Sequence, residues 1–344
     1  MIDTPDVLSE TPEAPPATGA DLLSLLLDDM HLAGMVLFRA ELSEPWAMMT
    51  PDASEMARLL PFPTEHIVPF HLIAEGGTWL EMDRSAPRWL ANGDAMLLPY
   101  GDGHGLHGQE DTDYVPLGAL LPPPPWSGLP VVEHGGGGAI THIVCGFLQC
   151  DELLFAPILR HLPRLIHVNP DAAGHSGWLT TTVRHTADEV LHSRPGSQSM
   201  LSRLTELMFV EILREHMRTL SINAVGWFAA ARDPLVGSAL RYLHAAPLES
   251  WNVERLAKKV GASRTVLAER FKLLVGQPPM QYLMHWRLQL AARQLKTTNT
   301  PVKTIAGRVG YDSEAAFSRS FKRCFGSAPV DWRKLQRTAQ PSSS

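Results

Sequence analysis

The stretch IAGRVGYDSEAAFSRSFK, residues 305–322, decides the fold of the C-terminal part of this 344-residue chain. Its apolar residues recur at helical spacing before Gly310 and again after Ser313, which predicts two helices. A glycine at such a point ends a helix in the left-handed conformation, and the serine caps the helix that follows. The stretch therefore predicts a helix, a tight turn and a second helix, as in a helix-turn-helix unit.

The same pattern occurs earlier in the chain, at an offset of 49 residues before the turn and 50 after it. A regular internal repeat indicates one supersecondary unit that is present twice. The matched pairs are Leu256 with Ile305, Gly261 with Gly310, Ser263 with Ser313, Phe271 with Phe321, Gly276 with Gly326 and Pro279 with Pro329. Asn252 and Thr300 are the predicted caps of the two first helices. The predicted inward positions of the second helices are Leu267, Phe271 and Leu274, and Phe317, Phe321 and Cys324.

The second helix of such a unit enters the major groove of DNA, where base edges present a readable pattern of donors and acceptors. The faces opposite the predicted cores are therefore candidate DNA-reading surfaces, although an ordinary solvated helix face is the alternative interpretation. Two copies in one basic segment favour DNA. The candidates are Arg264, Thr265, Ala268, Glu269 and Lys272 in the first copy, and Glu314, Ala315, Ser318, Arg319 and Lys322 in the second.

Residues 278–296 predict a long helix between the two units. A stiff connector would hold the two reading helices about one DNA turn, roughly 34 Å, apart. One protomer could then read two successive major grooves.

The formal net charge of −6 hides a strong asymmetry along the chain. Residues 234–337 hold 18 Lys+Arg and 6 Asp+Glu, a balance of +12, whereas the remainder holds 12 and 30, a balance of −18. Every lysine lies between Lys258 and Lys334. This split favours a basic module for a polyanion on an acidic body, although chance clustering on a solvated face would look the same.

The predicted fold class is α+β. We expect disordered tails at residues 1–19 and 337–344, a β-rich sensor and dimerisation domain with accessory helices at 20–220, a linker at 221–233, and an all-α DNA-binding domain at 234–336. No apolar run is long enough for a membrane span, and the three cysteines do not make a disulfide framework. A cytoplasmic protein with no membrane partner is therefore expected.

Residues 200–217 have the periodicity of an amphipathic helix. Its apolar side can pack against the β-rich domain, or it can form the seam of a homodimer. The predicted stripe consists of Leu201, Leu204, Leu207, Met208, Glu211 and Ile212.

From residue 234 to about 334 the sequence resembles the AraC/XylS family of bacterial transcription regulators. The resemblance rests on Trp286-Arg287-Leu288, on residues 305–313 and 317–322, and on Gly326 and Pro329. It implies a sequence-specific regulator, not an enzyme, that binds double-stranded promoter DNA as a homodimer in contact with RNA polymerase. Such a regulator can be an activator or a repressor of transcription. The residues implied to read bases are Thr265, Ala268 and Glu269 in the first unit, and Glu314, Ala315, Ser318 and Arg319 in the second.

The N-terminal part resembles the cupin-type β-barrel sensor domain of such regulators, which implies a small-molecule effector or a stress signal. Gly93, Pro99-Tyr100-Gly101 and His104 follow the second cupin motif. His71 and Glu75 fit the first motif only in part, because Pro69 stands where another histidine belongs. His71, Glu75 and His104 could hold a divalent metal, or the histidines could shape a pocket or core without one. A complete metal site would favour the alternative function, a metal-dependent cupin enzyme with a fused DNA-binding domain.

Cys145 and Cys150 are five residues apart. Free cysteines are most often inert and buried. A redox-sensing pair would need an exposed thiolate of low pKa, for which Arg160 or Arg164 could supply positive charge.

Overall fold

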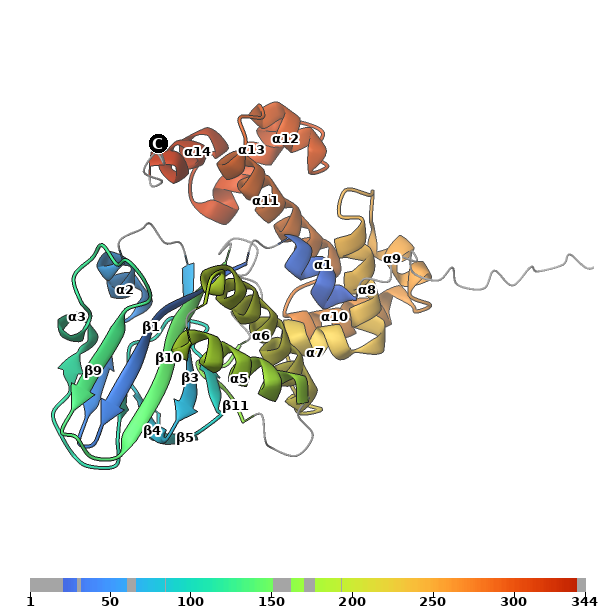
Figure 1. Ribbon diagram of the computed structural model, residues 1–344. Helices are drawn as coiled ribbons and strands as arrows, with labels where there is room; N and C mark the ends of the chain where they lie inside the picture. Colours follow the sequence, from blue (N-terminus) through green and yellow to red (C-terminus); the bar gives the residue numbers. More distant parts are fainter. Residues whose placement is uncertain are drawn as a thin grey trace, which may run out of the picture. The chain divides into compact units, whose positions relative to one another are not determined.

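The structure is a computed structural model, and it describes residues 21–29, 32–60, 66–83, 85–150, 162–169, 177–192 and 194–338. The chain divides into two compact units. One is the β unit, Met30–Leu220, and the other is the helical unit, which joins Met1–Asp29 to Ser221–Ser344. Figure 1 labels helices and some of the strands of the two units.

The β unit contains two sheets. The six-stranded sheet has the order β11-β6-β3-β10-β1-β9, and the five-stranded sheet has the order β5-β4-β7-β2-β8. The strands are β1 (Ala33–Ser43), β2 (Ala47–Thr50), β3 (His66–Glu75), β4 (Gly77–Met82), β5 (Arg88–Ala91), β6 (Ala95–Leu97), β7 (His104–His107), β8 (Val115–Pro116), β9 (Val131–Gly135), β10 (Ile140–Cys150) and β11 (Ile166–Val168). The α+β class is confirmed. In detail, the described strands form two separate sheets instead of one closed barrel.

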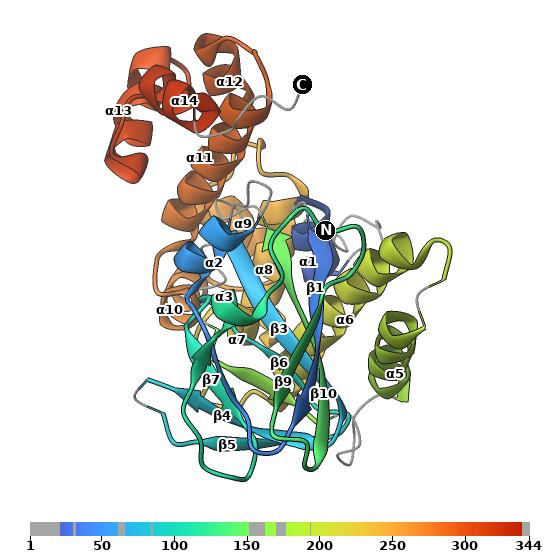
Figure 2. The same ribbon diagram turned by 60° about the vertical axis from the view of Figure 1, so that its left-hand side comes forward.

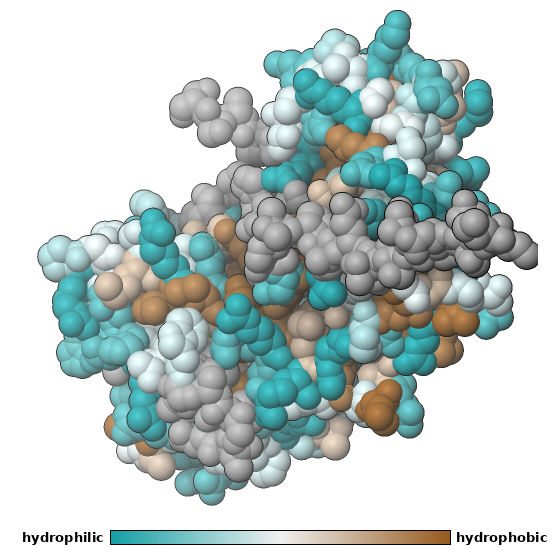
Figure 3. Space-filling model, turned by 90° about the vertical axis from the view of Figure 1, so that its right-hand side faces the viewer, coloured by the Kyte–Doolittle hydropathy of each residue, from teal (hydrophilic) through white to brown (hydrophobic). Residues whose placement is uncertain are grey.

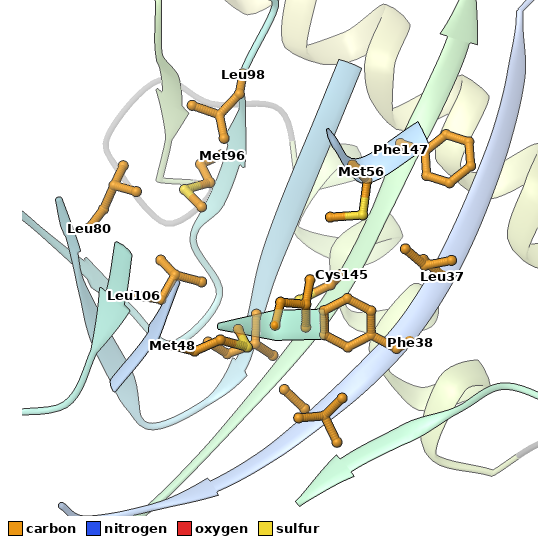
Figure 4. Packing of buried hydrophobic residues seen from close by; sticks show 14 of the residues in the cluster. Leu37, Phe38, Met48, Met56, Leu80, Met96, Leu98, Leu106, Cys145 and Phe147 are labelled. Carbon is orange, nitrogen blue, oxygen red and sulfur yellow. The ribbon is translucent and has the colours of Figure 1, made fainter. Parts of the chain in front are cut away.

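Both sheets contribute to one apolar core. Side chains of successive strand residues point to opposite faces, and in the second half of β1 buried residues such as Ala40 and Leu42 alternate with partly exposed ones. Figure 4 shows Phe38 and Cys145 of the six-stranded sheet and Met48 and Leu106 of the five-stranded sheet in the space between the strands. Short helices α2 (Ala53–Leu59) and α3 (Leu117–Leu120) add Met56 and Leu117 to this core.

Two longer helices, α5 (Gly177–Leu191) and α6 (Ser197–Thr219), pack against the six-stranded sheet. Helix α6 contacts β1, and α5 contacts both α6 and β3 (Figure 2). The buried side of α6 consists of Leu201, Thr205, Met208, Phe209, Ile212 and Leu213. The predicted helix over residues 200–217 is therefore present, but Leu207 points away from this core and is 49% exposed.

The helical unit carries the C-terminal elements and one helix from the start of the chain. Its helices are α1 (Leu22–Asp29), α7 (Trp227–Arg232), α8 (Pro234–Ala245), α9 (Val253–Lys259), α10 (Arg264–Val275), α11 (Pro279–Thr297), α12 (Val302–Arg308), α13 (Glu314–Phe325) and α14 (Pro329–Thr338). The long helix expected at 278–296 is α11.

Three expected domain bounds differ from the structure. Helix α1 belongs to the helical unit, because Leu22, Leu23 and Leu26 are buried and the helix packs on α8. The expected linker contains α7, whose Trp227 and Phe228 are each 2% exposed. Helix α14 continues to residue 338, two residues beyond the expected domain end. The expected tail at 1–19 lies outside the described residues.

Candidate nucleic-acid interface

The first helix-turn-helix unit consists of α9, a tight turn and α10. Asn252 caps α9, since its side chain accepts a hydrogen bond from the backbone N of Arg255 at 2.7 Å. Gly261 in the turn has a φ of +68°, a backbone angle that residues with a side chain rarely adopt. Ser263 caps α10 by accepting from the backbone N of Val266. The predicted caps and the predicted turn of this unit are confirmed.

The second unit consists of α12, the turn and α13, with Gly310 at φ +83° and Ser313 as the cap of α13. One prediction is wrong here: Pro301 takes the cap position of α12 that was assigned to Thr300. A proline has no side-chain acceptor, so the helix begins on the fixed φ of proline alone. Cys324 is also exposed and not inward.

Buried aromatic and aliphatic side chains hold the second helix of each unit in place. Leu267 and Phe271 of α10 and Phe317 and Phe321 of α13 have no exposed surface. The half-buried Phe325 takes the place expected for Cys324, and its ring centroid lies 4.5 Å from that of Phe321. The opposite faces of α10 and α13 are therefore left outward.

The structure places all ten predicted DNA-reading residues on these outward faces. Ala268 and Ser318 are half-buried and the other eight are exposed. Arg264 forms an ion pair with Glu254 of α9. The side chains of Lys272, Arg319 and Lys322 form no hydrogen bond or ion pair within the described part of the chain, so their charges face solvent. Each unit thus presents a short, cation-bearing helix face of the size that fits a major groove.

Arg287 lies on the connector α11 and belongs to the motif Trp286-Arg287-Leu288, for which the sequence predicted no role. It lies between the two helix-turn-helix units. Its Nε donates to the carbonyl of Pro247 at 2.6 Å and its Nη2 to that of Glu249 at 2.7 Å. Its Nη1 lies 3.1 Å from where a Cβ on Gly310 would be. Arg287 therefore bonds to the loop before α9 and lies beside the turn of the second helix-turn-helix unit.

A buried polar network ties α11 to the two helices that precede the first unit. The Nε1 of Trp227 donates to the hydroxyl oxygen of Tyr282 at 3.1 Å. That hydroxyl group lies 2.7 Å from Nε2 of His244. Burial lowers the pKa of His244 to about 3 and raises the pKa of Tyr282. His244 is therefore neutral in the folded protein.

Because the buried His244 is neutral, we expect acid to lower the stability of the helical unit. Unfolded His244 has a pKa of about 6.5, so the unfolded state binds more protons between that value and the folded pKa of about 3. The contribution of His244 to the free energy of unfolding is then fully present above about pH 6.5. It falls as the pH is lowered, and the loss reaches about 2 kcal/mol at about pH 5. Urea unfolding of the full chain at both pH values should show this loss. His244→Phe should show a smaller pH dependence, and an unchanged one would contradict the assignment.

In the β unit, His71, His104 and Cys145 form one buried hydrogen-bonded chain. His71 and Cys145 are opposite each other on β3 and β10, and their Nδ1 and Sγ atoms are 2.9 Å apart. The Nε2 atoms of His71 and His104 are also 2.9 Å apart. Because His104 lies on β7, this contact links the two sheets. The sequence predicted His71 and His104 in a candidate metal site and Cys145 in a candidate redox pair. The pairing of β3 with β10 brings the three residues together.

The direction of each hydrogen bond in this series follows from the bond that His104 makes with the backbone. Nδ1 of His104 lies 2.9 Å from the carbonyl of Asp102, which only accepts, so this nitrogen donates. Nε2 of His104 then accepts from His71, and Nδ1 of His71 accepts from the thiol of Cys145. Burial lowers the pKa of His104 to about 4 and that of His71 well below its ordinary value. Burial also raises the pKa of Cys145. All three groups are neutral, and each polar atom is satisfied.

Glu75 does not join the two histidines. It lies at the end of β3, with its side chain 61% exposed, and pairs with Nδ1 of His142 at 3.0 Å. Among the described residues, no three His, Cys, Asp or Glu side chains are arranged to hold a metal ion. The side chain of Cys150 and all of Arg160 lie outside the described residues, and Arg164 pairs with Asp102 at 2.7 Å. A buried Cys145 of raised pKa has the opposite character to a reactive thiolate.

Two helix-turn-helix units on one helical domain define a DNA-binding protein. A family model described as a helix-turn-helix domain matches residues 256–335, and one described as cupin matches residues 21–218. An AraC-like transcription regulator of Streptomyces lividans is 34% identical over 91% of this chain and 97% of its own length. The chain therefore belongs to the AraC-like transcription regulators and is a DNA-binding regulator of transcription.

Other relatives match this chain over most of their own length. The HTH-type transcriptional regulator AlkR of Acinetobacter baylyi is 28% identical over 91% of this chain and 99% of its own. The RCS-specific transcriptional activator RclR of Escherichia coli is 26% identical over 80% and 87%. The DNA-bound DNA-binding domain of AdpA is 33% identical, covers 32% of this chain and 99% of its own, and has a TM-score of 0.31. Every helix in the described part of the chain is too short or too polar to span a lipid bilayer.

Proposed function

We propose that α10 and α13 read bases in two successive major grooves of promoter DNA. The observation that carries this proposal is the pair of outward helix faces, each on a capped helix with a fully buried aromatic core. Within these faces, the N-terminal positions contact base edges, as in other helix-turn-helix units. These are Thr265, Ala268 and Glu269 in α10, and Glu314, Ala315, Ser318 and Arg319 in α13. Lys272 and Lys322, one or two turns farther along each helix, contact phosphates.

The chemistry of these residues suggests a division of labour. Arg319 can donate two hydrogen bonds to a guanine, and a carboxylate such as that of Glu269 or Glu314 can accept from the amino group of a cytosine. Ala268 and Ala315 offer only apolar contact, for instance to a thymine methyl group. A basic helical domain supplies the general attraction to phosphates.

The β unit, in this proposal, receives the signal. It supplies the regulator with a small-molecule or stress-responsive domain, and the protein acts in the cytoplasm as a homodimer that activates RNA polymerase. The resemblance to regulators of this architecture supports these roles, as does the name of the activator RclR. The alternative, a metal-dependent cupin enzyme, has less support because Glu75 lies apart from His71 and His104.

Selection of duplexes from a random pool by the full chain tests the proposal. We expect a recurring sequence with two short elements about one helical turn apart, bound at least about 10³-fold more tightly than unrelated DNA. Equal affinity for all duplexes at the same salt concentration would contradict it.

Lys272→Ala should weaken the binding of every duplex alike, because a phosphate contact carries no sequence information. The slope of log affinity against log salt should become shallower by about 0.9. Fluorescence anisotropy over a series of salt concentrations measures both quantities. Arg88→Ala removes the same charge from an exposed residue of the β unit and serves as the control. A Lys272→Ala slope equal to that of the control would show that Lys272 does not contact phosphate.

A further inference from the structure

The outer side of the five-stranded sheet carries a row of aromatic side chains. Within the β unit, α5 and α6 pack against the six-stranded sheet, and Figure 2 shows β4 and β5 away from these two helices. Successive residues of a strand point to opposite faces. On β4, Leu80 and Met82 belong to the core, so Trp79 and Glu81 point outward. Trp79 is half-buried and Glu81 is exposed.

Strand register places further rings beside Trp79. Its direct neighbours across the sheet are Trp89 of β5 and His107 of β7. The indole rings of Trp79 and Trp89 meet edge to face, with their centroids 5.4 Å apart. Tyr114, from the loop after β7, meets His107 in the same way, with the centroids 6.1 Å apart. We call these residues the aromatic face: Trp79, Glu81, Trp89, His107 and Tyr114.

Two glycines make room for two of these rings. A Cβ on Gly77 would lie 2.3 Å from Cζ2 of Trp89, and a Cβ on Gly105 would lie 2.6 Å from Cε1 of Tyr114. Each ring therefore lies directly over the backbone of the sheet, and a side chain at either glycine would have to displace it. Isolated exposed apolar residues are ordinary, and the face in Figure 3 shows such brown patches separated by teal and white. The aromatic face is instead a contiguous surface that the backbone is shaped to carry.

Glu81 gives the aromatic face a negative charge. Its Oε2 accepts from the hydroxyl group of Tyr114 at 3.0 Å. Burial and this carboxylate raise the pKa of Tyr114 to about 12, so the phenol stays protonated and remains the donor. Arg88 precedes Trp89 on β5 and therefore points to the other side of the strand. The loop that carries Tyr114, residues 108–114, contains no Lys or Arg and three acidic residues: Glu110, Asp111 and Asp113.

Two acceptors of the aromatic face lie side by side. Nδ1 of His107 lies 2.8 Å from the carbonyl of Gly108, which only accepts, so Nδ1 carries a hydrogen. In the neutral ring Nε2 is then an acceptor, and it lies 3.6 Å from Oε1 of Glu81. This separation is too long for a hydrogen bond. It suits two acceptors that bind the same ammonium group.

We propose that the aromatic face binds a protonated amine with a short apolar chain. The ammonium group donates to Nε2 of His107 and to Oε1 of Glu81. Trp79 is the direct neighbour of His107 and lies on the same side of β4 as Glu81, so its indole ring lies beside the bound cation. Indole is the side-chain ring that attracts a cation most strongly. The adjoining ring of Trp89 extends the surface for the apolar chain.

This site would supply the β unit with an amine as its small-molecule signal. That consequence rests on the proposed function, whereas amine binding itself does not. Amine binding is therefore measured without DNA, and its failure would leave the DNA-reading proposal untouched. Conversely, a chain that binds the amine but no duplex would refute only the proposed function.

Isothermal titration calorimetry of the full chain with n-butylammonium chloride, at constant ionic strength, tests the proposal. We expect saturable binding with a dissociation constant of about 0.1–1 mM, which is within the limit for a ligand of this size. n-Butanol and butyrate have chains of the same length without the positive charge, and each should bind at least about tenfold more weakly. Absence of butylammonium binding, or equally tight binding of butanol, would overturn the proposal.

Glu81→Gln should weaken butylammonium binding at least about tenfold, because the hydrogen bond to the ammonium group loses its charge. The amide oxygen can still accept from Tyr114, so the variant should keep the thermal unfolding temperature of the unchanged protein. Glu133→Gln removes the same charge from an exposed residue of β9, on the six-stranded sheet, and should bind like the unchanged protein. A Glu81→Gln variant that binds as tightly as this control would contradict the assignment.

Two substitutions of Trp79 test the part played by the ring. Trp79→Phe keeps an aromatic ring, which still attracts a cation, whereas Trp79→Leu keeps only apolar bulk. Among variants whose thermal unfolding shows a folded β unit, phenylalanine should bind butylammonium more tightly than leucine. Equal binding by the two folded variants would overturn the role given to Trp79.

Discussion

Replacing Phe321 by alanine should lower the free energy of unfolding of the helical unit by about 3–5 kcal/mol. The Phe321 side chain has no exposed surface. Its ring centroid lies 5.5 Å from that of Phe317, 4.5 Å from that of Phe325 and 5.8 Å from that of Trp332. Alanine would leave a cavity that helices α13 and α14 cannot close without losing these contacts. Phe321 therefore anchors the second reading helix.

Urea unfolding followed by circular dichroism measures this loss. The matched control is Cys324→Ala, one turn farther along the same helix, where the side chain is exposed. An exposed position should tolerate the change within about 0.5 kcal/mol. A Phe321→Ala variant as stable as the control would show that α13 does not pack as described.

Arg319→Ala should lower the affinity for the selected duplex by about 1–3 kcal/mol, the cost of losing a bidentate base contact. Arg319 is exposed and has no partner among the described residues, so the substitution removes no internal contact. The variant should also accept other base pairs at one position of the recognition sequence. Anisotropy titrations against single-base-pair variants of the duplex measure both effects.

Arg319→Lys distinguishes base reading from simple attraction to phosphate. Lysine keeps the charge but lacks the planar fork that matches a guanine edge. If Arg319 reads a base, the lysine variant should lose discrimination at that position almost as fully as the alanine variant. Full recovery of affinity and specificity by lysine would assign Arg319 to a phosphate contact.

The helix-turn-helix units could be predicted from the sequence because their signals are local. Asn252, Ser263 and Ser313 each cap the helix that immediately follows them, and Gly261 and Gly310 end the helices at the predicted points. Such signals act over a few residues and need no knowledge of the rest of the chain. The boundary at Thr300 failed because proline itself can begin a helix.

Contacts between distant segments could not be predicted in this way. Asp233, placed in a linker by the sequence, caps α8 and also accepts from Nε of Arg270 of α10 at 3.0 Å. Helix α1 packs on α8 from more than two hundred residues away. Arg287 of α11 donates to two carbonyls of the loop before α9 and lies beside the turn at Gly310. Each contact depends on tertiary packing, which local sequence patterns do not report.

The buried pair of histidines illustrates the same limit. Motif spacing brought His71, Glu75 and His104 into one predicted site. The structure keeps His71 with His104 and Cys145, and leaves Glu75 at the surface with His142. Strand register decides which side chains are opposite each other, and the sequence does not fix that register. The histidines consequently link two sheets in a closed, neutral network.

Hydroxyl-radical footprinting of the full chain on a duplex with one recognition sequence tests most directly whether two helices read two grooves. The account predicts two protected segments on one face of the duplex, about one helical turn apart. Arg319→Ala should weaken one of them and Thr265→Ala the other. Inserting about five base pairs between the elements should abolish simultaneous protection, because α11 cannot rotate one unit about the DNA axis. A single protected segment, or protection that survives the insertion, would contradict the account.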